Sequence, residues 1–229
     1  MAETLQMSLL TDPVQPDHLQ IAVRYRPAAH DAKVGGDWYD AFLTADDELS
    51  LVIGDVAGHD RTAVAAMGQL RNLLRGISYT LQEPPARVLA GLDEAMQGLA
   101  IDVYATAVLG QVEGDTLEWC NAGHLPPVLV EPDGTSHLLA TPPEAMLGIA
   151  PADRRDHRVT LKPGAAVVIY TDGLIERRGV SLTDSLRWLV GELDGCADMS
   201  AEAIADHVID RIEEPAEDDI ALLVLRASP

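Results

Sequence analysis

The stretch VGGDWYDAFLTADDELSLVIGDVAGHD, residues 34–60, carries an aspartate at the outer end of each of two strand-like runs. The runs 37–43 and 49–55 flank a short polar connection, a pattern typical of a β-hairpin. In an antiparallel pair, the residue numbers of two directly opposed residues always add up to the same value. A turn near residue 46 sets this value near 92. Asp37 and Asp55 have that sum. The hairpin should therefore place these carboxylates opposite each other, with Cβ atoms about 4.5–5.5 Å apart.

A second group of aspartates lies at strand ends further along the chain. The apolar run 165–171 ends at Asp172, and Asp218 and Asp219 begin the last run, 219–226. If the two runs are antiparallel neighbours, Asp172 lies beside Asp218 or Asp219. Facing carboxylates repel unless a cation lies between them, and oxygen ligands of this type suit Mg²⁺ or Mn²⁺. Several carboxylates at one site suit two metal ions.

A simpler interpretation of these aspartates remains open on spacing alone. A single aspartate at a strand end is more often a turn former than a ligand. Neighbouring glycines favour the metal interpretation, because glycine permits close approach of backbone. Gly35 and Gly36 precede Asp37, Gly58 follows Asp55, and Gly173 follows Asp172.

The order of the remaining elements predicts the fold class. Helical spacing extends over 61–80 and again after Pro84 and Pro85. Further strands are expected at 19–26, 103–113, 116–121, 126–131, 136–140 and 157–161, and further helices at about 181–193 and 200–213. This order predicts an α+β fold with antiparallel sheets and segregated helices.

The expected domain organisation is one large domain with a short leading segment. Residues 13–229 should form the domain, and residues 1–12 a linker or regulatory helix. The run ETLQMSLL, residues 3–10, is too short for a stable isolated helix. It is therefore expected either to pair with a second copy of the chain or to continue a helix of an upstream domain.

Composition limits the partners and the compartment. Acidic residues number 37 against 16 basic ones, a net charge of -21, which argues against nucleic acid or an anionic membrane as the main partner. Two scattered cysteines form no disulfide framework, and no apolar run approaches the roughly 18 residues of a membrane helix. Without a basic-then-apolar leader, the expected location is the reducing cytoplasm.

Six stretches in order resemble one known family. They are VGGDWYD (34–40), GDVAGHD (54–60), NAGHLPPVLV (121–130), MLGI (146–149), YTDGLIE (170–176) and DDIALLVLR (218–226). Together they resemble the metal-dependent type 2C protein serine/threonine phosphatases, in their bacterial SpoIIE-like branch. The resemblance implies a β-sandwich of two antiparallel sheets with helices on both outer faces, and two Mn²⁺ or Mg²⁺ ions at one end.

The resemblance also implies a role for each aspartate. Asp55 would bridge both metal ions, while Asp37 and the backbone carbonyl of Val56 would hold one of them. Asp172 and Asp218 would hold the other. Asp219 is the second choice, since the wider family often has asparagine there.

Two histidines are candidates for the general acid that protonates the leaving serine. His59 is the stronger, because it lies four residues after the bridging aspartate, and His124 is the weaker. A structural hydrogen bond is the open alternative for both. The next residue, Asp60, stands where this branch usually has glycine, and it is expected to cap the helix that begins near Arg61. An additional contact to a metal ion or a water molecule is the open alternative.

The resemblance implies a protein serine/threonine phosphatase that uses a metal-activated water, acting on a phosphorylated anti-sigma-factor antagonist in a stress or partner-switching pathway. One alternative is a pseudo-phosphatase that docks a partner without turnover, although all four metal aspartates are present. The other is a nucleotide cyclase, suggested by Gly-Gly-Asp. The chain has only two lysines, Lys33 and Lys162, and lacks a GxxxxGK[ST] loop, so the cyclase hypothesis is weaker.

Overall fold

A computed structural model describes residues 10–28, 35–58, 61–149, 153–212 and 218–228. The chain divides into two compact units. The first comprises Met1–Val14, Ala32–His124 and Thr141–Thr160, and the second comprises Gln15–Asp31, Leu125–Ala140 and Leu161–Pro229. No helix in the described part of the chain is both long enough and apolar enough to cross a membrane.

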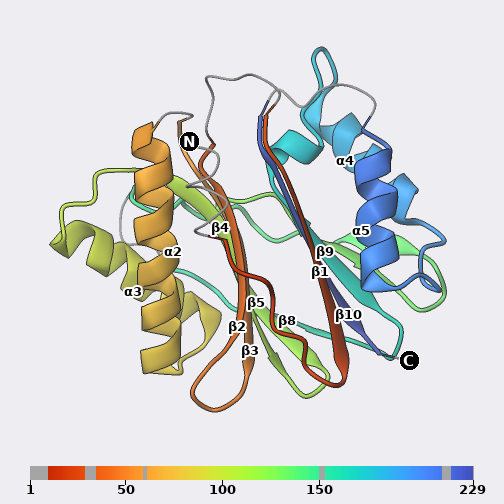
Figure 1. The fold of residues 1–229 in the computed structure, drawn as a ribbon, viewed down its shortest axis with the longest axis horizontal. Helices are drawn as coiled ribbons and strands as arrows, with labels where there is room; N and C mark the ends of the chain where they lie inside the picture. The colour runs from red at the N-terminus through yellow and green to blue at the C-terminus, as the bar shows by residue number, and fades with distance from the viewer. Residues whose placement is uncertain (1–9, 29–34, 59–60, 150–152, 213–217, 229) are drawn as a thin grey trace. The chain divides into compact units, whose positions relative to one another are not determined.

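The first unit contains a five-stranded sheet and two helices (Figure 1). The strand order is β2-β3-β4-β5-β8, and every neighbouring pair is antiparallel. The elements are β2 (Asp37–Leu43), β3 (Leu49–Val56), α2 (Arg61–Leu81), α3 (Pro85–Gly98), β4 (Ala105–Glu113), β5 (Thr116–Ala122) and β8 (His157–Thr160).

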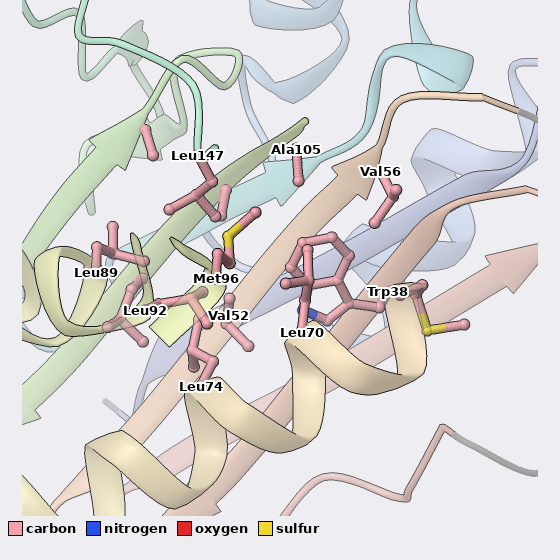
Figure 2. Packing of buried hydrophobic residues seen from close by; sticks show 14 of the residues in the cluster. Trp38, Val52, Val56, Leu70, Leu74, Leu89, Leu92, Met96, Ala105 and Leu147 are labelled. Carbon is pink, nitrogen blue, oxygen red and sulfur yellow. The ribbon is translucent and has the colours of Figure 1, made fainter. Parts of the chain in front are cut away.

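One face of this sheet is covered by α2 and α3. The apolar residues of α2 recur at helical spacing, so Val64, Met67, Leu70 and Leu74 share one buried stripe. Figure 2 shows Leu70 and Leu74 packed among side chains of the sheet and of α3, with the indole of Trp38 at the centre of the contact. This core holds the open end of the β2–β3 hairpin in place.

A buried ion pair also fastens α2 to β2. The Asp40 side chain is buried and lies 3.0 Å from Arg71 and 3.2 Å from Arg75, both on α2. A buried carboxylate needs such compensation. Asp40 therefore holds α2 against the hairpin that carries Asp37 and Asp55.

The second unit contains another antiparallel sheet, with strand order β1-β10-β9-β6-β7. Its core lies between the sheet and the helices α4 and α5, which are labelled in Figure 1. The elements are β1 (Leu19–Arg26), β6 (Val128–Val130), β7 (Ser136–Leu138), β9 (Ala166–Tyr170), the 3₁₀ helix η1 (Asp172–Leu174), α4 (Leu182–Leu193), α5 (Ala201–Asp210) and β10 (Ile220–Ala227).

The structure confirms the α+β class with two antiparallel sheets and segregated helices. Several ends differ from the sequence prediction. β4 begins at Ala105 rather than at residue 103, because the Tyr104 carbonyl accepts a bond from Ala57 and Ala105 pairs with Leu147. The turn η1 was not predicted. The expected helix at 3–10 lies outside the described residues except for Leu10, which is not helical.

Candidate active site

The β2–β3 hairpin places Asp37 directly opposite Asp55, as the index sum predicts. Its connection closes through a bond from the Thr44 amide to the Glu48 carbonyl, 2.8 Å long, and Asp47 has a φ of 61°. Asp37 is buried and Asp55 is half-buried. Two carboxylates thus share the open end of one hairpin, which is the geometry that favours a cation between them.

Gly36 allows the backbone to close around this pair. A Cβ atom at residue 36 would lie 2.2 Å from the carbonyl oxygen of Val56, so only glycine fits. The Val56 amide also donates to the Gly36 carbonyl over 3.2 Å. The Val56 carbonyl, a predicted ligand, therefore lies against the Gly-Gly-Asp segment that carries Asp37.

Thr106 extends this polar edge, and the sequence analysis did not single it out. Thr106 lies opposite Asp55 in the β3–β4 pairing, and its hydroxyl is 2.6 Å from Nδ1 of His124. The β4–β5 hairpin offered a signal for half of this arrangement, because it pairs Val108 with Asn121 and so brings the segment after β5 near Thr106. In the structure Gly123 bridges Ala107, the neighbour of Thr106. The β3–β4 pairing had no such signal, since two helices separate these strands.

The second unit brings Asp172 and Asp218 together. A Cβ atom on Gly173 would lie 2.1 Å from the Asp219 carbonyl oxygen and 3.3 Å from that of Asp218, so this glycine permits close approach of the two chain segments. The Asp172 side chain reaches solvent, yet the protein atoms around it remove part of its hydration and raise its pKa. The nearby carboxylates of Asp218 and Glu176 raise that pKa further.

Asp219 has a different environment from Asp218. Its side chain is buried, accepts a hydrogen bond from the Tyr25 hydroxyl, and accepts another from the Ala28 amide over 2.8 Å. These bonds tie the end of β1 to the start of β10. They give Asp219 a structural role, and its assignment as a metal ligand stays a prediction.

The two histidine candidates for the general acid differ in whether the structure describes them. His59 and the capping candidate Asp60 both lie outside the described residues. His124 is described, and its ring is held by Thr106.

The residues present fit hard divalent cations. Each unit, taken by itself, contains a pair of neighbouring carboxylates: Asp37 with Asp55 in the first and Asp172 with Asp218 in the second. Oxygen atoms are the ligands that Mg²⁺ and Mn²⁺ prefer, and Gly36 makes room for the Val56 carbonyl. Among the described residues, no three His, Cys, Asp or Glu side chains gather as a metal-binding group, so a site of four aspartates remains a proposal.

Comparisons with known proteins agree on the type of domain. Phosphoserine phosphatase RsbP of Bacillus subtilis is 25% identical over 186 residues, which cover 77% of this chain and 44% of RsbP. This chain thus spans less than half of that relative. The RsbU and RsbW domains of Rv1364c from Mycobacterium tuberculosis are 30% identical, with a TM-score of 0.78, and the match covers 94% of this chain and 61% of that one.

Another similar structure is a complex with a metal ion. RsbX in complex with magnesium is 19% identical, with a TM-score of 0.74, and the match covers 95% of this chain and 99% of RsbX. At that identity the likeness shows the fold alone. The model for the family of Stage II sporulation protein E (SpoIIE) matches residues 45–228, a range that contains Asp55, Asp172 and Asp218. The chain belongs to the SpoIIE family and has the α+β fold of PP2C-type phosphatase domains.

Proposed function

We propose that this chain is a metal-dependent protein serine/threonine phosphatase. The observation that carries the proposal is the direct pairing of Asp37 with Asp55 in a chain of the SpoIIE family. The phosphatase activity named for RsbP supports the same reaction. The substrate would be a phosphoserine or phosphothreonine ester, hydrolysed to the alcohol and inorganic phosphate.

Asp55 would bridge two divalent cations, Mn²⁺ or Mg²⁺. Asp37 and the Val56 carbonyl would hold one, and Asp172 and Asp218 the other. When bound, two such ions supply a nucleophile by lowering the pKa of water, and they neutralise charge on the phosphoryl group. The carboxylates orient the ions, and His59 is the candidate proton donor to the leaving serine. The RsbX complex with magnesium supports the use of a divalent cation.

The substrate we propose is a phosphorylated anti-sigma-factor antagonist in a partner-switching pathway of the cytoplasm. RsbP, the RsbU domain and a stressosome structure among the similar proteins support this class. Residues 1–12 are proposed to join two copies of the chain or to receive a signal. Sedimentation of the chain with and without residues 1–12 tests this, and unchanged association and unchanged activity would rule it out.

The reaction is tested by phosphate release from a phosphoserine peptide. We expect turnover with Mn²⁺ and none after chelation with EDTA. Binding of the peptide without phosphate release would indicate a pseudo-phosphatase. Conversion of ATP or GTP to a cyclic product without peptide hydrolysis would indicate a nucleotide cyclase.

A further inference from the structure

A row of polar side chains crosses three strands at one end of the first sheet. Asp37 opposes Asp55 across β2 and β3, and Asp55 opposes Thr106 across β3 and β4. Directly opposed residues in an antiparallel sheet project from the same face, with Cβ atoms about 4.5–5.5 Å apart. Thr106 is therefore a cross-strand neighbour of the carboxylate proposed to bridge both metal ions.

The row lies on the sheet face opposite the two helices. The strand neighbours Trp38, Val56, Ala105 and Ala107 all belong to the core beneath α2 and α3, and Figure 2 shows three of them pointing into it. Because side chains alternate along a strand, Asp37, Asp55 and Thr106 project the other way. The Thr106 hydroxyl thus shares a face with the two carboxylates.

His124 holds that hydroxyl through a short bond. Its Nδ1 is 2.6 Å from Oγ1 of Thr106, a distance at the short end for such a pair. A threonine hydroxyl can donate one hydrogen bond and accept others. Because one hydrogen-bonding position of the Thr106 hydroxyl is taken by the imidazole, its other hydrogen bonds must form on the remaining side of the oxygen.

The backbone of His124 is itself fixed. Oδ1 of Asn121 accepts from the His124 amide over 2.7 Å, and Nδ2 of Asn121 donates to the His124 carbonyl over 3.0 Å. Gly123 has a φ of 69°, and a Cβ atom there would lie 2.7 Å from Cγ of Met146. The sequence Asn-Ala-Gly-His therefore builds a rigid turn that presents one imidazole to Thr106.

We propose that Thr106 and His124 are positioning residues for Asp55. The imidazole keeps the Thr106 hydroxyl in one orientation, and the hydroxyl keeps the Asp55 carboxylate in the orientation that binds a divalent cation. Residues that orient a metal ligand commonly change metal affinity or activity by about 10–100-fold when removed. This inference rests on the proposed function, since it assigns the cation to Asp55.

The deciding variant is Thr106→Val, which keeps the branched shape and removes the hydroxyl. We expect the dissociation constant for Mn²⁺, measured by titration calorimetry, to rise about 10–100-fold or kcat to fall by the same factor. Thr106→Ser, which keeps the hydroxyl, should retain most of the Mn²⁺ affinity and of the kcat. His124→Ala should reproduce the loss, while His124→Asn, whose amide can occupy the place of Nδ1, should lose less.

A matched control removes a similar bond elsewhere in the same sheet. Ser50 on β3 lies 3.0 Å from Ser78 through their buried hydroxyls, five residues from Asp55 along the strand. Ser50→Ala should lower thermal stability in EDTA and leave Mn²⁺ affinity and kcat unchanged. If Thr106→Val behaves like Ser50→Ala, the Thr106–His124 bond only staples the turn and the inference is overturned.

The test separates this inference from the proposed function. If the unmodified chain releases no phosphate but binds Mn²⁺ in a Thr106-dependent way, the phosphatase proposal fails and the positioning role stands. If the unmodified chain is active and both Thr106→Val and His124→Ala match it in Mn²⁺ affinity and kcat, the positioning role is overturned and the phosphatase proposal stands. If Thr106→Val does not fold, the comparison of His124→Ala with His124→Asn decides.

Discussion

Asp55 is the residue on which the proposed chemistry depends most. Its carboxylate faces Asp37 across the hairpin and Thr106 across the next pairing. We expect Asp55→Ala to abolish phosphate release, because it removes the ligand shared by both cations. The fold should survive, since the substitution also relieves repulsion with Asp37.

Phosphate release and circular dichroism of Asp55→Ala measure this prediction. The matched control is Asp46→Ala, which removes an exposed carboxylate from the other end of the same hairpin. Activity near the wild-type level in Asp55→Ala would contradict the bridging role.

Asp40 illustrates a carboxylate with a purely structural role. It is fully buried, and Arg71, itself 5% exposed, is its nearest cation. We expect Asp40→Ala to lower the free energy of unfolding by about 3–5 kcal/mol, because it removes the carboxylate that neutralises the buried Arg71 guanidinium. Urea unfolding at pH 7 measures the change.

The control for Asp40 is an exposed ion pair of the same unit. Arg158 is 69% exposed and lies 2.8 Å from Glu118. Arg158→Ala should change the free energy of unfolding by no more than about 1 kcal/mol. If Asp40→Ala and Arg158→Ala change the free energy of unfolding equally, burial does not make the Asp40–Arg71 pair more important for stability than an exposed pair.

At the scale of elements, the second unit depends on one glycine between η1 and the start of β10. A Cβ atom on Gly173 would lie 2.1 Å from the Asp219 carbonyl, so Gly173→Ala must push the two segments apart. We expect a loss of about 1–3 kcal/mol in stability, as for other overpacked sites, together with weaker Mn²⁺ binding. Urea unfolding and titration calorimetry measure the two effects.

A glycine of α4 provides the comparison. Gly191 lies inside the helix, and a Cβ atom there meets nothing within 4 Å. Gly191→Ala should stabilise the chain by up to about 1 kcal/mol, because glycine is unfavourable inside a helix. Unchanged Mn²⁺ affinity in Gly173→Ala would show that the turn η1 does not shape the metal site.

At the scale of the whole molecule, the large negative charge opposes folding. The net charge is -21, so the folded chain carries a long-range repulsion that a bound cation reduces. A cation that binds only the folded form stabilises it by about 2.7 kcal/mol at one hundred times its dissociation constant. For a chain of this size the melting temperature should rise by about 5–10 °C.

Calorimetry in EDTA and then in excess Mn²⁺ measures this rise. The effect should be larger at pH 7.5 than at pH 5, because protons compete with the metal for the carboxylates. Asp55→Ala should show a smaller rise than the unmodified chain. A melting temperature that does not respond to Mn²⁺ at pH 7.5 would mean that the aspartates form no cation site.

The sequence by itself determined the features that local rules control. A short polar turn and two flanking runs set the β2–β3 register, so the pairing of Asp37 with Asp55 followed from counting. Helical spacing in α2 identified the buried stripe that packs on Trp38. Of the glycines beside the aspartates, Gly36 and Gly173 lie where backbone segments approach closely, whereas a Cβ atom on Gly58 would meet only Ala63, at 3.8 Å.

Only the tertiary structure decided which distant segments lie side by side. No turn sets the pairing of β3 with β4 or of β1 with β10, since long connections separate these strands and burial of whole faces decides the partner. The neighbourhood of Thr106 and Asp55, and the bonds that Asp219 makes to the end of β1, follow from those pairings. A register fixed by a turn is a local property, whereas a register fixed by packing depends on the folded unit as a whole.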